Sequence, residues 1–336
     1  MRSPVLATAP CSRAAGLLCM RAIAIALAFL PALTLAVDQG MVITNPEPNK
    51  AGQPDDRVLQ PYEPITGGWT KDSDDVSYLD VTLSVKVRLL PVIPQLPRSR
   101  VFLALTTRFG FYWGTRPNSP VIGKDYNPKL LWRFLPDATP NSLGGNSGQY
   151  ASYLDVAYAH ESNGQIVHTL AQYKEELVTA SPPEYADNFI HRGWDYPEVA
   201  WKHTFSHDIA LYLDGKYFLP YGLLQGPEDQ YHPWENNPQG KPRRAVDGLE
   251  AQVAWPSSNL YIPLTGGRSF SRPNLTLKYK TGYDVPFKYS TVRAELGCEC
   301  AWLPIAIWAQ HGYMSDLAMY YQKVTSYGIE LRFESF

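Results

Sequence analysis

The chain has 336 residues, with 30 lysines and arginines against 32 aspartates and glutamates, and a formal net charge of −2. This near-neutral balance gives no electrostatic reason to expect nucleic acid as a partner, so we predict none. The sequence contains 22 tyrosines, nine tryptophans and 29 prolines, a composition typical of many short strands joined by tight turns rather than of helices.

The first 36 residues have the features of an export signal. Arg21 precedes an apolar run over residues 22–36, which ends in a small residue just before Val37 and Asp38. The run is short for a membrane span, and a basic front with a small-residue end is typical of a secretory signal peptide. We therefore predict a signal peptide over residues 1–36, with Met20 as an alternative start. A retained membrane anchor is the weaker alternative.

Two cysteines remain once the signal segment is removed. Cleavage takes away Cys11 and Cys19 and leaves Cys298 and Cys300. A disulfide between positions i and i+2 of one strand is strained, so we expect both remaining cysteines to be free. The sequence contains neither a disulfide framework nor a zinc-binding pattern.

The pattern of the mature chain changes near residue 78. Residues 37–77 are rich in Pro, Gly and Asp and show little periodicity, which indicates an extended lead-in segment. In Leu79–Leu89, by contrast, every odd position is apolar and every even position is polar, a period of two that predicts a strand. Similar alternation recurs at residues 101–113, 249–255, 275–280, 292–300 and 327–333.

Two all-β architectures produce such strands, a soluble β-protein and a transmembrane barrel. Segments of about eleven residues match a tilted membrane-crossing strand, and polar faces with charges of both signs suit a hydrated lumen. An aromatic residue, Phe336, ends the chain, as is common in outer-membrane barrels. We predict one transmembrane antiparallel β-barrel over residues 78–336, with about ten to fourteen strands. A soluble periplasmic β-protein is the weaker alternative.

The segment Leu154–Gly164 carries the candidate chemistry. Its alternation puts His160 and Ser162 on the same face as Val156, which is the lipid face if the chain is a membrane barrel. Side chains at i and i+2 of a strand are neighbours, so a hydrogen bond between imidazole and hydroxyl is possible. A histidine there gains no packing and costs desolvation, which favours a functional role. The alternative is a histidine in the interfacial zone, bound by water.

Several motifs resemble those of the outer-membrane phospholipase A family. The run His160-Glu161-Ser162-Asn163-Gly164 resembles its His-x-Ser-Asn-Gly signature. The resemblance implies a bacterial outer-membrane location and a barrel of twelve antiparallel strands whose active site faces the outer-leaflet lipid. Further matches follow in order along the chain: Asn118-Ser119-Pro120, Tyr126-Asn127-Pro128, Arg192-Gly193-Trp194-Asp195, Ala294-Glu295-Leu296-Gly297 and Gly312-Tyr313.

The resemblance implies catalytic roles for three residues. Ser162 is the implied nucleophile and His160 its base. Asp195 occupies the orienting position that is usually Asn, and a carboxylate there can also stabilise the imidazolium. Because this chain has a longer insert between residues 164 and 192, two further side chains stay as alternatives for the orienting role, Asp187 and Asn188.

The resemblance also implies a Ca²⁺ cofactor near the oxyanion and an active homodimer. The implied calcium ligands are the carbonyl of Gln165 and, across the dimer interface, Asn118 or Ser119. His191 stands where the family has a Ser ligand, and imidazole suits calcium poorly. Alternative oxygen ligands from the insert are Glu184 and Asp187.

These observations predict a calcium-dependent outer-membrane phospholipase, of A1/A2 and lysophospholipase type, acting on the acyl esters of membrane phospholipids. The alternative from another class is a non-enzymatic outer-membrane barrel, a pore or adhesin, in which His160 and Ser162 are incidental. The lumen separates the two hypotheses. An enzyme barrel is expected to be packed shut by ion pairs that include Arg108, Arg293 and Glu295, whereas a pore conducts ions.

Overall fold

The computed structural model describes most of the chain from Val58 onward. The described residues are 58–73, 75–91, 93–135, 152–180, 183–205, 209–225, 234–235, 241–256, 263–264, 268–269, 271–300 and 303–333. The predicted signal peptide 1–36 and the terminal Phe336 lie outside them. None of the described helices is both long and apolar enough to cross a membrane.

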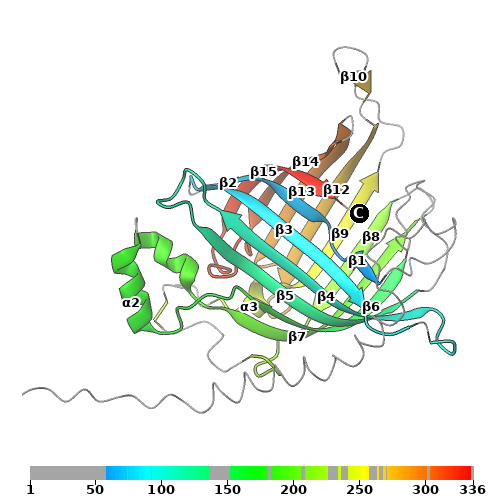
Figure 1. Cartoon of the computed structure of the whole chain (residues 1–336), viewed down its shortest axis with the longest axis horizontal. Helices are drawn as coiled ribbons and strands as arrows, with labels where there is room; N and C mark the ends of the chain where they lie inside the picture. Colours follow the sequence, from blue (N-terminus) through cyan, green and yellow to red (C-terminus); the bar gives the residue numbers. More distant parts are fainter. Residues whose placement is uncertain are drawn as a thin grey trace, which may run out of the picture. The chain divides into compact units, whose positions relative to one another are not determined.

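Twelve of the described strands form one closed antiparallel sheet (Figure 1). Each strand pairs with the next along the chain, and the last strand, red in Figure 1, pairs with the first, blue, which closes the ring. This confirms the predicted all-β antiparallel barrel of about twelve strands. The strands are β2 (Ile65–Asp72), β3 (Ser77–Arg88), β4 (Ser99–Phe111), β5 (Val121–Phe134), β6 (Tyr153–Ser162), β7 (Gly193–Thr204), β8 (Ala210–Lys216), β9 (Gly248–Pro256), β12 (Ser271–Gly282), β13 (Ser290–Cys300), β14 (Leu303–Gly312) and β15 (Val324–Phe333).

The remaining described elements are short and are not part of the ring of twelve strands. β1 pairs with β3, and β10 pairs with β11. Helix α2 begins with a capping box, in which Thr169 and Gln172 bond each other's backbone N–H groups. These elements are β1 (Leu59–Pro61), α2 (Leu170–Thr179), η1 (Pro183–Phe189), α3 (Arg243–Val246), β10 (Pro263–Leu264) and β11 (Arg268–Ser269).

The barrel begins before residue 78, within the stretch that the sequence assigns to a lead-in segment. β2 pairs with β3 and β15 on its two sides, and Trp69 lies opposite Leu79 on the outer face. Its outward positions also include Gly67 and Lys71, which interrupt the apolar pattern. The strand therefore lacks the period-two signal by which its neighbours are recognised.

Alternation along each strand separates an apolar outer wall from a charged lumen. In β3, for example, Leu79 and Leu83 are exposed whereas Ser84 and Lys86 are buried. This is the arrangement of a barrel whose outside faces lipid. Exposed apolar residues of the outer wall include Leu79, Leu83, Leu103, Leu105, Leu130, Trp132, Val156, Val199, Leu213, Val253, Leu277, Val292, Leu296, Ile307 and Ile329.

Ion pairs line the lumen, as predicted for Arg108, Arg293 and Glu295. Arg108 bonds Asp80 at 2.5 Å. Glu295 is 1% exposed and contacts three cations: Lys278 at 3.1 Å, and Arg293 and Arg332 at 2.5 Å each. A further set crosses the β5–β7 side: Lys129–Glu198 at 2.8 Å and Arg133–Asp155 at 2.6 Å. Each of these charged groups thus has a partner on the same strand or within two strands of it.

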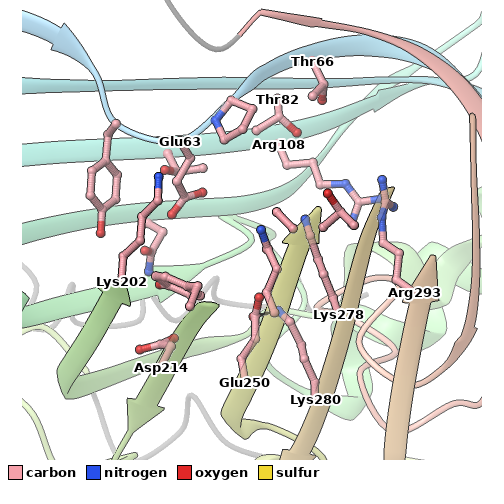
Figure 2. A pocket seen from close by; sticks show the side chains of 18 of the residues that line it. Glu63, Thr66, Thr82, Arg108, Lys202, Asp214, Glu250, Lys278, Lys280 and Arg293 are labelled. Atoms are coloured by element: carbon pink, nitrogen blue, oxygen red, sulfur yellow. Dashed lines mark ion pairs between the residues drawn. The ribbon is translucent and has the colours of Figure 1, made fainter. Parts of the chain in front are cut away.

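The lumen is not filled completely by these side chains. A cavity of about 610 Å³ runs along it, lined by charged residues of many strands. Figure 2 shows Lys278, Lys280 and Glu250 projecting into this cavity, with Lys202 on the same side and Glu63 opposite them. Ion pairs are therefore present in the lumen as predicted, but they do not pack it shut.

An aromatic plug covers the barrel end at which β6 terminates. It consists of strand-end residues and of loop residues that meet across the barrel. Trp194 packs edge-on against Tyr320 at 5.4 Å between ring centroids, which joins β7 to the loop between β14 and β15. The buried members of the plug are Ala159, Trp194, Tyr196, Phe218, Val246, Tyr313, Leu317, Tyr320 and Tyr321.

One cysteine differs from the sequence-based expectation. Cys298 takes part in a disulfide bond, so the prediction that it is a free thiol is wrong. The prediction considered only the strain of a close pairing.

The cluster around Glu295 yields a stability prediction. Glu295→Gln removes the one carboxylate that Lys278, Arg293 and Arg332 share, and leaves the two arginines only their longer contacts with Glu330, at 3.4 and 3.9 Å. We expect the free energy of unfolding to fall by about 3–5 kcal/mol. Urea unfolding of the barrel in lipid vesicles measures it.

The matched control for this measurement is Asp75→Asn. Asp75 forms an exposed pair with Lys71, and exposed pairs contribute little. We expect no measurable change for that variant. Equal effects of the two substitutions would contradict a stabilising role for the Glu295 cluster.

Candidate active site

The end of β6 presents three polar side chains on the outer wall. Tyr158, His160 and Ser162 alternate with the inward residues Ala159 and Glu161, of which Ala159 is 1% exposed. The inward residues fix the register because Ala159 belongs to the plug and Glu161 pairs with Arg243 at 2.5 Å. His160 and Ser162 therefore point outward, as the alternation predicts.

Strand pairing brings Asp195 to His160. The two residues lie directly opposite each other in the β6–β7 ladder. His160 Nδ1 lies 2.5 Å from Asp195 Oδ1, and Asp195 is 0% exposed. With an ionised carboxylate as acceptor, Nδ1 carries the proton and Nε2 has the lone pair. The imidazole is then in the tautomer that a general base requires.

Ser162 follows two residues after His160 on the same face. Alternate side chains on a strand have Cα atoms about 7 Å apart, a gap that an imidazole spans. In the described part of the chain, no hydrogen bond engages Ser162 Oγ. Ser162, His160 and Asp195 thus share one small patch of the outer wall, and the His–Asp link is already formed.

Tyr158 and a loop segment complete the surroundings of Asp195. Tyr158 Oη donates to Asp195 Oδ2 at 2.7 Å, and the backbone N–H of Leu224 donates to the same oxygen at 2.7 Å. The backbone N–H of Asp195 donates to Gln225 Oε1 at 2.8 Å. The sequence analysis missed all three. Tyr158 shares the face of His160 and was detectable on that ground, whereas the contacts of Leu224 and Gln225 leave no pattern in the sequence.

Gly222 allows this loop to approach the carboxylate. A Cβ atom at residue 222 would lie 2.1 Å from Asp195 Oδ2 and 2.2 Å from its Cβ. Those separations are far below van der Waals contact, so a side chain at this position displaces either the loop or Asp195. The loop and the carboxylate therefore fit together only with glycine at position 222.

The turn after Ser162 is held by Asn163 and Gly164. Asn163 is 1% exposed; its side chain donates to Ile190 O at 2.8 Å and accepts from Arg192 N at 2.9 Å. Gly164 has a φ of +62°, a conformation that favours glycine. Asn163 and Gly164 therefore form a turn that is fastened to the segment leading into β7.

Arg192 fastens that segment to the plug. Its guanidinium is fully buried and bonds both carboxylate oxygens of Glu235 and the carbonyl of Ala318. Residue 318 belongs to the loop between β14 and β15, on the opposite side of the ring from β7. The start of β7, which carries Asp195, is thus anchored across the barrel end.

The alternative orienting residues lie elsewhere. Asp187 accepts a hydrogen bond from Tyr173 at 2.5 Å, and Asn188 accepts one from Arg116 at 2.6 Å. Burial and the Asp187 carboxylate raise the pKa of Tyr173, so this contact persists at neutral pH with a protonated phenol. Among the three candidates for the orienting role, Asp195 is the one in contact with His160.

The residues implied as calcium ligands do not form an oxygen cage. Gln165 O accepts a hydrogen bond from His191 Nδ1 at 3.0 Å, so an imidazole N–H occupies the space beside that carbonyl. Asn118 and Ser119, which the resemblance implies as ligands from the second protomer, lie in a turn with positive φ values of 60° and 45°. Glu184 lies in η1, and its side chain is outside the described atoms.

This donor set does not fit calcium, which takes six to eight oxygen ligands. His168 packs against His191 with 4.2 Å between ring centroids and adds a second nitrogen-bearing ring rather than an oxygen. Within the described residues, no group of three or more His, Cys, Asp or Glu side chains is arranged to hold a metal ion.

The fold is similar to that of solved outer-membrane phospholipases. An active-site mutant of outer membrane phospholipase A from Escherichia coli aligns with 14% identity and a TM-score of 0.56, over 85% of this chain and 96% of that one. The Salmonella typhi outer membrane phospholipase dimer with bound calcium gives 14% identity and a TM-score of 0.56, over 84% and 95%. No protein-family model and no curated protein matches the sequence. At this identity the likeness concerns the fold.

The geometry around Gln165 and His191 predicts a weak response to calcium. Calcium at about 10 mM, tenfold above the weakest dissociation constants of extracellular calcium modules, would stabilise a protein with such a site by about 1.4 kcal/mol. We expect no shift in the unfolding midpoint in urea at that concentration. A shift that a chelator reverses would contradict the conclusion that calcium does not fit.

The variant His191→Ser tests whether the imidazole is the obstacle. It frees the carbonyl of Gln165 from its hydrogen bond and adds a hydroxyl oxygen beside it. We expect this variant to respond to calcium more than the unsubstituted protein does. Magnesium, which demands a stricter octahedral geometry, serves as the ion control.

Proposed function

We propose that this protein is an outer-membrane serine hydrolase that cleaves acyl esters of phospholipids and lysophospholipids. Ser162 is the nucleophile, His160 the general base and Asp195 the residue that orients the imidazole. The observation that carries the proposal is the 2.5 Å contact between His160 and Asp195 on the outer wall, with Ser162 on the same face. The fold likeness to outer-membrane phospholipases supports it independently.

The chemistry follows from these three side chains. Ser162 Oγ attacks the ester carbonyl carbon while His160 Nε2 accepts the hydroxyl proton. The tetrahedral intermediate collapses, the bond to the alcohol oxygen breaks, and His160 returns its proton to that alcohol. Water then attacks the acyl-enzyme by the same route and releases a fatty acid. Asp195 stabilises the imidazolium in both steps.

The position of the site explains the choice of substrate class. Ser162 and His160 stand on the wall whose other outward residues, such as Leu130 and Val156, are exposed and apolar. A lipid reaches such a site sideways from the bilayer, whereas a water-soluble ester has to approach through the interface. Acyl esters near the headgroups of membrane phospholipids lie at the depth of a strand end.

We extend the proposal to location and assembly. The barrel fold and its outer-membrane neighbours support insertion in the bacterial outer membrane after export. The Salmonella typhi neighbour is a dimer with bound calcium, and that likeness supports a homodimer as the active form of this chain. The proposal gives calcium no role in catalysis, because His191 already bonds the Gln165 carbonyl that would bind the ion.

Side-chain replacement tests the catalytic assignment. Ser162→Ala and His160→Ala are each expected to lower the rate of phospholipid hydrolysis in mixed micelles at least about 10³-fold, because the covalent route is lost. Asp195→Ala and Asp195→Asn should each lose about 10³–10⁴-fold, since the amide oxygen of Asn would accept from Tyr158 and Leu224 and its NH2 group would face His160 Nδ1.

Asp187→Asn is the matched control for these variants. It alters a nearby carboxylate that contacts Tyr173 and not His160, so we expect a rate close to that of the unsubstituted protein. Hydrolysis that survives in Ser162→Ala would remove the serine mechanism. Labelling of Ser162 by a fluorophosphonate measures nucleophile reactivity without a lipid substrate.

The competing pore hypothesis makes a different prediction for the same preparation. The plug around Trp194 and Tyr320 covers one end of the lumen, and its residue Tyr313 also lines the cavity behind it. We therefore expect no steady ion conductance in planar bilayers. Sustained open-channel current at low voltage would favour the pore.

A further inference from the structure

The segment of residues 217–225, here called the strap, follows β8 and crosses the outer wall beside the active site. β8 pairs with β7 from Thr204 back to Glu198, and the strap takes over the free edge of β7 beyond that point. Tyr217 N donates to Pro197 O at 3.1 Å, and Leu219 N donates to Asp195 O at 2.9 Å. The strap is thus bonded to the same strand that carries the catalytic carboxylate.

The strap is the reason that Asp195 is buried. Asp195 points outward, since it lies opposite the outward His160, yet it is 0% exposed. Gly222 packs on the carboxylate without room for a Cβ, and Leu224 N donates to Oδ2. Without this cover an ionised group would face hydrocarbon on the outer wall, where such groups are strongly disfavoured.

The opposite side of the strap is apolar and exposed. Tyr221 is 74% exposed, Leu223 79% and Leu224 48%. Three large apolar side chains within four residues form a patch rather than scattered exposure. The patch adjoins the apolar outer wall of β6 and β7, so a membrane around the barrel is the partner that both surfaces share. Tyrosine and leucine at a barrel rim suit the interface between headgroups and acyl chains.

Leu223 and Leu224 contact the active site through their backbone and expose their side chains on the outer surface. Leu223 N donates to Tyr158 Oη at 2.9 Å and Leu224 N to Asp195 Oδ2 at 2.7 Å, while the leucine side chains point away from the protein. Any lipid contact that holds these side chains in place also holds their N–H groups on Tyr158 and Asp195. Loss of that contact leaves residues 219–225 attached by a few hydrogen bonds, while Phe218 stays packed in the plug.

We propose that the strap inserts into the outer-leaflet lipid and that this insertion fastens Asp195 in its catalytic position. The strap thereby makes hydrolysis depend on a lipid surface. This inference rests on the proposed function for its catalytic consequence, but the insertion itself does not. Tyr158 and Leu224 are positioning residues, because they act on the substrate through Asp195 and His160.

Depth of insertion is measured with a nitroxide at Tyr221→Cys in the full barrel, folded into phosphatidylcholine vesicles. We expect the label to be accessible to oxygen and shielded from a water-soluble nickel chelate. Val178→Cys on α2 is the matched control, since Val178 is apolar and 86% exposed but belongs to another loop. The unsubstituted chain, treated alike, corrects for labelling of its own cysteines. Equal nickel accessibility at residues 221 and 178 would overturn the insertion.

Coupling to catalysis is measured as a ratio of two activities. Leu223→Ser keeps the backbone N–H and removes the apolar side chain, so hydrolysis of phosphatidylcholine vesicles should fall about tenfold relative to hydrolysis of a soluble p-nitrophenyl ester. Val178→Ser should leave the ratio unchanged. Gly222→Ala, which moves the strap off Asp195, should lower both activities together.

The outcomes separate the two proposals. An unchanged ratio in Leu223→Ser would overturn the coupling even if the label inserts. If the unsubstituted protein hydrolyses neither substrate, the proposed function fails, and the nitroxide depth still decides whether the strap enters lipid.

Discussion

The candidate active site depends on one constraint, that an ionised carboxylate must be kept hydrogen-bonded on the apolar outer wall of the barrel. A bare charge in hydrocarbon is strongly unfavourable. Asp195 meets this constraint with three donors, His160, Tyr158 and the N–H of Leu224. Such donors are available only at the rim, where the strand ladder ends and loop N–H groups become free. The chemistry is therefore confined to the last few residues of β6 and the first few of β7.

On the inner face of the same strands, carboxylates are stabilised by ion pairs with basic side chains. Glu161, between His160 and Ser162, pairs with Arg243, and Glu198 on β7 pairs with Lys129. These buried pairs and the plug hold β6 and β7 rigid from behind. Side chains inside the barrel thus fix which face of each strand points inward. The alternate residues, His160 and Ser162 among them, must then point outward. One strand pair thus carries structural ion pairs on its inner face and the candidate catalytic residues on its outer face.

The sequence predicted what depends on local periodicity and missed what depends on loops. Alternation was sufficient for β3 and for the outward face of β6, because each apolar position there contacts lipid. β2 was missed because Gly67 and Lys71 dilute its pattern. Asp195 was predicted from its motif. The hydrogen bond from Leu224 N–H was not, because nearly every residue has a backbone N–H group and the sequence does not mark this one. The calcium expectation did not foresee that His191 bonds the carbonyl of Gln165.

Closure of the ring by β2 and β15 has a consequence for biogenesis. The two strands pair residue Asp72 with Ser326, so the seam joins parts of the chain about as far apart in sequence as a barrel allows. Contacts of such long sequence separation form slowly. Until the carboxyl-terminal strand has been synthesised and delivered, both β2 and its neighbours expose open edges that invite aggregation. Conditions that keep β2 and β15 apart for long therefore favour aggregation over closure of the ring.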